Sequence, residues 1–149
     1  MAIIEQKLEA MGIILQDPPV PNHPILRCKQ SGNLLFVSGH GTAYKGKVGA
    51  DLTVEDGYVA AREAAIHCLE AIKQHVGDLD KVTNFLKVFG MVNSAPDFIQ
   101  QPAVINGVSD LLIEVFGQEI GSHARSAVGM VSLPNGIAVE VEMIAEIAG

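Results

Sequence analysis

Apolar residues recur at helical spacing in three stretches of the chain. The first and shortest covers residues 3–11 and ends at Gly12. The second is predicted to begin after Thr53, because Asp56 completes a capping-box pattern, and to end at Gly77. Its apolar stripe consists of Ala61, Ala65, Cys68 and Ile72.

The third helical stretch ends at Gly117, but two starts are open. Ser94-Ala95-Pro96-Asp97 resembles a helix start with Pro96 in the first turn. Pro102 lies inside the periodic pattern and marks either a kink or the true start of the helix. The stripe itself consists of Val104, Val108, Leu111 and Val115.

Between these helices, other segments show the patterns of strands. Leu26–Gln30 and Leu34–Ser38 flank Ser31-Gly32-Asn33, which predicts a β-hairpin. Val82–Val92 carries apolar residues at both odd and even positions, which indicates a strand buried on both faces. The glycine-rich segment 39–52 is predicted to be irregular.

The last two strands are predicted to form a second hairpin. Residues 124–132 and 137–147 flank Asn135-Gly136, and Asn-Gly is the strongest short-range signal for a hairpin turn. The second of these strands alternates apolar and polar residues over most of its length, which is typical of a strand with one buried face.

This element order, α-β-β-α-β-α-β-β, predicts an α+β fold in which two long helices cover one face of a mixed sheet. We expect one domain over residues 1–149, in which 1–23 is an extension of helix and Pro-rich loop. The second sheet face is then solvated or covered by another subunit. Hydrophobic residues make up 48% of the chain and charged residues only 18%, which favours a subunit interface.

Composition narrows the function further. The net charge of −7 and the absence of basic runs argue against nucleic acid as a partner. Cys28 and Cys68 have no CxxC spacing, and the five histidines show no metal-binding motif, so we predict reduced thiols and neither metal nor cofactor. We expect a cytoplasmic protein and no membrane partner, because no secretion signal or membrane-length apolar run is evident.

Two charged residues near the C-terminus are candidates for chemistry. Arg125 opens a small, apolar strand, and its planar guanidinium suits bidentate binding of a carboxylate. Glu140 lies between Val139 and Val141, where a half-buried carboxylate could hold and activate a water molecule. The alternatives are an ordinary strand-edge charge for the arginine and a solvated acidic stripe for the glutamate.

Further candidates lie earlier in the chain. Gly39 lets a ligand approach the backbone beside Ser38, and Asn106 offers an amide, or is simply a solvated helix residue. If Asn135-Gly136 centres a hairpin, Arg125 and Glu140 share a sheet face but lie about 20 Å apart along the ladder. One site that uses both would then have to lie between subunits.

The residues above also carry a family resemblance. The segments Ala124–Val128, Leu133-Pro134 and Val139–Glu142 are similar to the signature of the RidA/YjgF family, also called endoribonuclease L-PSP. Leu35–Gly39 is similar to its earlier strand-and-loop motif, and the resemblance spans roughly residues 24–149. The extra N-terminal helix indicates a longer subgroup.

The resemblance implies a chorismate-mutase-like fold, a homotrimer with clefts between subunits, and enamine/imine deaminase chemistry on small 2-imino or 2-keto carboxylates. Arg125 matches the carboxylate-binding arginine and Glu140 the glutamate that orients water. Asn106 matches a cleft asparagine, and Ser38 and Gly39 match a ligand-contacting loop.

The chain departs from that pattern at two positions. Ile25 stands where deaminating members carry a tyrosine, and Ala127 where many carry a cysteine. His40 and His123 flank the matched motifs and are candidates to replace the lost hydroxyl. The alternatives to a deaminase are a non-catalytic metabolite-binding trimer and, less favoured by the charge, a single-strand endoribonuclease.

Overall fold

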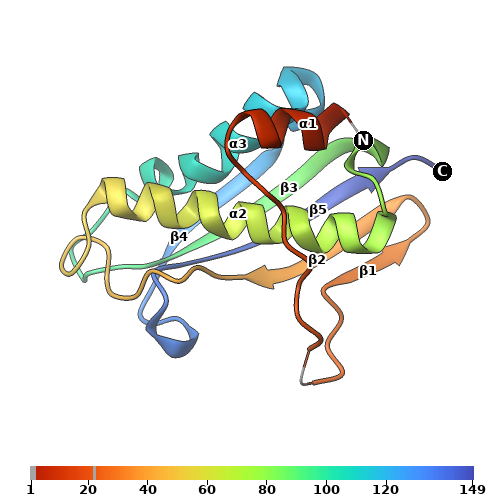
Figure 1. The fold of residues 1–149 in the computed structure, drawn as a ribbon. Helices are drawn as coiled ribbons and strands as arrows, with labels where there is room; N and C mark the ends of the chain where they lie inside the picture. The colour runs from red at the N-terminus through yellow and green to blue at the C-terminus, as the bar shows by residue number, and fades with distance from the viewer. Residues whose placement is uncertain (1–2, 22) are drawn as a thin grey trace.

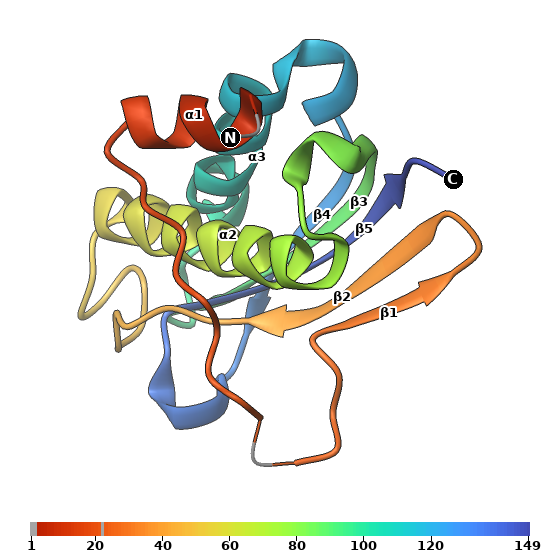
Figure 2. The same ribbon diagram turned by 45° about the vertical axis from the view of Figure 1, so that its right-hand side comes forward.

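The computed structural model describes residues 3–21 and 23–149 and confirms the predicted order of elements. It contains one five-stranded sheet with the strand order β1-β2-β5-β3-β4 and helices packed on one side of it (Figures 1 and 2). The strands are β1 (Cys28–Ser31), β2 (Leu34–His40), β3 (Val82–Asn93), β4 (Ala124–Met130) and β5 (Val139–Ile147).

The two long helices, α2 (Val54–Val76) and α3 (Gln101–Gly121), cover the sheet, and α1 (Ile3–Ala10) lies beside α3. Thr53 and Asp56 form the predicted capping box at the start of α2, and Gly77 ends the helix with a φ of 86°. From α1 the chain crosses over α2 to reach β1 (Figure 2). None of the helices in the described part of the chain has the length and apolar character needed to cross a membrane.

The start of α3 decides between the two predicted alternatives. The helix begins at Gln101, with Pro102 in its first turn, so Pro102 marks the true start and the start at Ser94–Asp97 is wrong. A proline is tolerated there because the first amides of a helix have no partner within it. Gly117 interrupts the helix with a φ of 85° and a ψ of 166°, and one further turn leads to Gly121.

The C-terminal strands do not form the predicted hairpin. β4 pairs parallel with β3, and β5 pairs antiparallel with the opposite side of β3, so β3 separates them. Asn135 and Gly136 do adopt positive φ values, 59° and 71°, but within a short 3-10 turn of the crossover between β4 and β5. The local turn signal was correct, whereas the strand partners are chosen by burial of β3 in the sheet centre.

The core lies between the sheet and the helices. β3 alternates between fully buried residues on the helix side, such as Val88 and Val92, and half-buried ones on the other side, such as Phe89 and Met91. Within one chain β3 is therefore buried fully on one face only. The open face carries further apolar side chains, namely Phe36, Val128 and Ile144.

Candidate functional site

A β-bulge brings three of the predicted residues together on the open face of the sheet. On β2, Val37 pairs with Met143 and His40 with Val141, which leaves Ser38 and Gly39 opposite a single residue of β5. The Glu140 side chain lies over Gly39 so closely that a Cβ there would overlap its carboxylate and come within 3.1 Å of Cδ. We call Ser38, Gly39 and Glu140 the bulge cluster.

The two polar side chains of the bulge cluster differ in their bonding. The Ser38 hydroxyl donates to the carbonyl of Leu26 at 2.6 Å, and its amide donates to the carbonyl of Arg27 at 2.8 Å. Glu140 is half-buried, yet its carboxylate has neither a hydrogen bond nor an ion pair within residues 3–21 and 23–149. The carboxylate is therefore free to accept hydrogen bonds from water or a ligand.

The second group of predicted residues lies where β4 meets α3. Nη1 of Arg125 donates to Oδ1 of Asn106 at 2.8 Å and to Oγ of Ser109 at 3.1 Å. Ser109 Oγ lies 2.8 Å from Nε2 of His123, whose Nδ1 lies 2.7 Å from the carbonyl oxygen of Gly121. We call Asn106, Ser109, His123 and Arg125 the arginine cluster.

The charge state of the arginine cluster follows from these contacts. Burial lowers the pKa of His123 below its usual value, and the positive charge of Arg125 lowers it further, although the bond to Gly121 opposes the shift. Within the described residues Arg125 makes no ion pair, since both its partners are neutral oxygens. No carboxylate therefore offsets the positive charge of the guanidinium before a ligand binds.

The bulge cluster and the arginine cluster lie apart in one chain. Arg125 is in register with the buried residue Val88 and reaches α3, so it lies on the helix face of the sheet. Glu140 is in register with Met91 on the open face. The prediction that they share a face is wrong, because it rested on the hairpin that the chain does not form. They lie on opposite faces, two strand spacings apart across the sheet and three residues apart along β3, which is about 10 Å in each direction.

His40 does not join the bulge cluster, although it follows Gly39 directly. It faces the helices, where its Nδ1 lies 2.7 Å from the Ser38 carbonyl oxygen, and burial lowers its pKa. It lines a pocket of about 510 Å³ together with His67 and Glu70, and Nδ1 of His67 lies 2.8 Å from Oε1 of Glu70. The ring of His123 is also engaged within the protein, since its Nε2 contacts Ser109.

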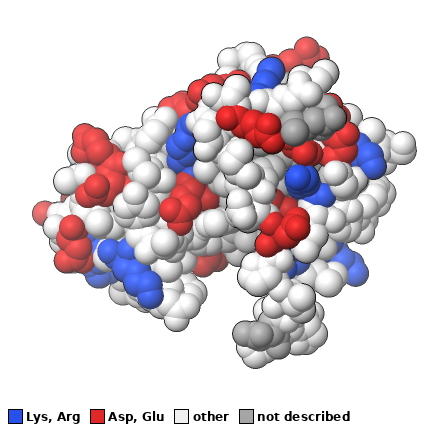
Figure 3. Space-filling view, in the orientation of Figure 1, with Lys and Arg blue, Asp and Glu red and all other residues white. Residues whose placement is uncertain are grey.

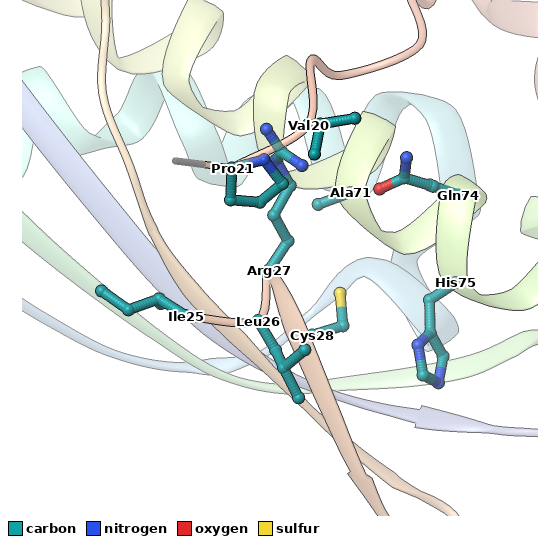
Figure 4. A pocket seen from close by; sticks show the side chains of 9 residues that line it. All are labelled: Val20, Pro21, Ile25, Leu26, Arg27, Cys28, Ala71, Gln74 and His75. Atoms are coloured by element: carbon teal, nitrogen blue, oxygen red, sulfur yellow. The ribbon is translucent and has the colours of Figure 1, made fainter. Parts of the chain in front are cut away.

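Ile25, at the place of the family's tyrosine, lies in the loop before β1. Its exposed side chain borders a pocket of about 290 Å³ between this loop and α2 (Figure 4). Neither Arg125 nor Glu140 lines that pocket.

Among the described residues, no group of three or more His, Cys, Asp or Glu side chains could hold a metal ion.

Sequence reasoning missed Ser109, which joins Arg125 to His123. The available signal was its spacing of three residues from Asn106, which places both side chains on one face of α3. The contact to His123 spans 14 residues and depends on how the chain turns after Gly117 and Gly121. No local pattern predicts such a turn.

This fold and these clusters define a chorismate-mutase-like α+β protein, and comparison with known proteins specifies the family. The sequence model of the YjgF/chorismate mutase-like endoribonuclease family matches residues 25–147. The chain therefore belongs to this family, as the resemblance predicted.

Individual relatives match along almost the whole chain. Protein TCP17 of Trypanosoma cruzi is 40% identical over 97% of this chain and 94% of its own length. The crystal structure of protein Atu1372 of Agrobacterium tumefaciens, whose function is unknown, is 38% identical, covers 98% of this chain and 93% of its own, and superposes with a TM-score of 0.91.

A more distant structure has the same fold. YjgF of E. coli is 24% identical, with a TM-score of 0.60, and covers 87% of this chain and 93% of its own. At that identity the likeness shows the fold alone.

Proposed function

We propose that this protein is a homotrimeric hydrolase of small 2-imino acids, with sites between subunits. In each site Arg125 of one subunit binds the substrate carboxylate, and Glu140 of the next orients the attacking water. The observation that carries this proposal is the bonding of Arg125, a half-buried residue whose guanidinium is held, among the described residues, by neutral oxygens alone. Such a group is prepared to bind an anion.

The placement of the two clusters supports a site made by two chains. A single chain puts Glu140 and Arg125 on opposite faces of the sheet, so one small molecule cannot touch both. The open face also exposes apolar surface, including Phe36, whose exposed fraction is 44%. Phe36, Phe89 and Ile144 line a pocket of about 360 Å³ there, which a second copy of the chain would fill.

The proposed reaction is the hydrolysis of an iminium. The oxygen of a water held by Glu140 bonds to the iminium carbon while the carboxylate takes a proton from that water. The C–N π electrons move to nitrogen and give a carbinolamine. Glu140 then returns this proton to the nitrogen. As the C–N bond breaks, its electrons leave with ammonia and the hydroxyl proton of the carbinolamine passes back to the Glu140 carboxylate, which leaves a 2-keto acid. Arg125 keeps the substrate carboxylate bound throughout.

A non-catalytic metabolite-binding trimer is the second candidate, and Ile25 and Ala127 favour it. Neither neighbouring candidate is placed to replace the missing tyrosine, since the Ser38 hydroxyl is engaged with the Leu26 carbonyl and His40 faces the helices. A hydrolase of this kind would depend on Glu140 alone for proton transfer.

RNA cleavage, which the family name suggests, has less support. Figure 3 shows Lys and Arg side chains interspersed with acidic and uncharged ones on the visible face, and the net charge is −7. A phosphate backbone is normally bound by a continuous basic surface.

The test is ammonia release from freshly generated 2-iminopropionate by wild type, Arg125→Ala and the control Arg62→Ala. Arg62 pairs with Glu114 between α2 and α3, outside both clusters. We expect activity in wild type and Arg62→Ala, and a loss of about a hundredfold or more in kcat/KM in Arg125→Ala. Ammonia release at the uncatalysed rate in wild type would contradict the hydrolase and favour the binding trimer.

A further inference from the structure

Two residues of the arginine cluster, Ser109 and His123, form a chain of hydrogen bonds behind Arg125. We propose that Ser109 and His123 are positioning residues, which fix the guanidinium of Arg125 so that a carboxylate binds to its Nε–Nη2 edge. This inference rests on the proposed function, since it concerns the same carboxylate site. It gives His123 a role behind the arginine instead of contact with the substrate.

The bonds of Nη1 determine which edge of the guanidinium remains available. Nη1 carries two hydrogens, and its two acceptors are Oδ1 of Asn106 and Oγ of Ser109. Nε and Nη2 of Arg125 donate to no other group in the described part of the chain. Because Nε–H and one Nη2–H point the same way, they form the fork that receives both oxygens of a carboxylate.

The tautomer of His123 determines the direction of the Ser109 hydroxyl. The carbonyl of Gly121 can only accept, so the ring nitrogen 2.7 Å from it, Nδ1, carries the proton. In a neutral ring Nε2 is then an acceptor, and the Ser109 hydroxyl donates to it across 2.8 Å. The lone pairs of Ser109 are left to accept from Arg125, and no hydroxyl hydrogen opposes the guanidinium.

The element that holds these side chains is rigid. Asn106 and Ser109 lie one turn apart on α3, on either side of Gly107. A Cβ on Gly107 would overlap the carbonyl of Tyr58 and come within 3.1 Å of the backbone nitrogen of Arg62, so α3 packs directly against the backbone of α2. This close contact fixes the rotation of α3, and with it the two acceptors of Nη1.

Titration with pyruvate, followed by NMR chemical shifts, tests the inference with five variants. Ser109→Ala and His123→Leu remove the links in the chain of hydrogen bonds. Ser109→Thr keeps the hydroxyl, and His123→Gln puts an amide oxygen near the position of Nε2. Ser122→Ala is the control, since the hydroxyl of Ser122 accepts a hydrogen bond from the Gln118 amide and has no other partner in the described part of the chain. Unfolding temperatures confirm that each variant is folded.

We expect Ser109→Ala and His123→Leu to raise the Kd for pyruvate about tenfold, which is the effect of losing one hydrogen bond to a charged group. Ser109→Thr, His123→Gln and Ser122→Ala should remain within about twofold of wild type. With 2-iminopropionate, KM should rise in the same two variants while kcat stays constant, because Glu140 is untouched. A role in folding alone would not be rescued in this way.

Two results would overturn the inference, and they differ in meaning. If wild type binds pyruvate and Ser109→Ala binds it equally well, positioning by Ser109 is wrong and the carboxylate site stands. If wild type does not bind pyruvate, the proposed carboxylate site is wrong, and the positioning role is wrong with it.

Discussion

The bulge cluster and the arginine cluster hold opposite charges in opposite ways. Arg125 is fixed by two hydrogen bonds to α3, and behind them by His123 and a backbone carbonyl. Glu140 has no such partners in the described part of the chain, and its side chain packs over Gly39. A fixed cation suits the binding of one end of a substrate, whereas an unbonded carboxylate suits the exchange of protons with water. This difference predicts that variants in the arginine cluster will change KM and that variants in the bulge cluster will change kcat.

The largest effect that separates the two clusters is expected from Glu140→Gln. The amide keeps the shape of the side chain but cannot accept the proton of water, so kcat should fall by about two orders of magnitude or more. KM should stay close to that of wild type, because Arg125 still binds the carboxylate. Steady-state assays of ammonia release measure both constants, and a rise in KM at constant kcat would reverse the assigned roles.

A smaller effect is expected when Gly39 becomes alanine. The new methyl group must displace the Glu140 carboxylate, while the backbone at Gly39 has no positive φ and accepts alanine without strain. We predict a fall in kcat of about tenfold, with the unfolding temperature nearly unchanged. Gly32→Ala is a matched control in the β1–β2 turn. A Cβ added there has no atom within 4 Å, but Gly32 has a φ of 59°, which alanine rarely adopts. It should leave kcat unchanged and lower stability.

Each region also contains a histidine that links stability to pH. The pKa values of His40, beside the bulge, and of His123 are lowered in the folded protein, chiefly by burial. Below pH 6.5 the unfolded chain therefore binds more protons than the folded one, and stability must fall as the pH falls. Urea unfolding between pH 7.5 and 5 should show this decline, and His40→Gln and His123→Gln should each reduce it. If stability declined as steeply in both variants as in wild type, these two histidines would not be the cause of the pH dependence.

The smallest predicted effect concerns the thiols near the bulge. Burial raises the pKa of Cys28 to about 11 and that of Cys68 further, and the Cys68 thiol donates to the Val141 carbonyl beneath the sheet. Both cysteines are free and buried, so a thiol reagent at pH 8 should react slowly with the folded protein and rapidly in urea. Fast reaction of the folded protein at either cysteine would show that this region opens.

The sequence predicted those parts of the fold that depend on local signals. The capping box at Thr53, the hairpin of β1 and β2, and the stop at Gly117 each follow from a few neighbouring residues. The pairing of β4 with β3 does not follow from neighbouring residues. Asn135-Gly136 permits a tight turn, but it does not determine which strand pairs with β4. That pairing depends on burying Val88 and its neighbours of β3 in the centre of the sheet.

The candidate site shows the same division. Arg125 and Glu140 stand out in the sequence because each is a charge in an apolar strand. Their opposite faces, and the role of Ser109 between Arg125 and His123, depend on long-range pairing and on the turn after α3. Residue types were therefore predictable, whereas their relative geometry required the structure.

The most direct test of the central claim, a site shared by two subunits, is complementation between inactive variants. Arg125→Ala and Glu140→Gln are co-expressed with different tags, and doubly tagged oligomers are purified and assayed with 2-iminopropionate. In a cyclic trimer, every oligomer that carries both tags has both wild-type residues in one of its three clefts, so about a third of wild-type activity should return. Mixed oligomers as inactive as either parent would contradict the shared site.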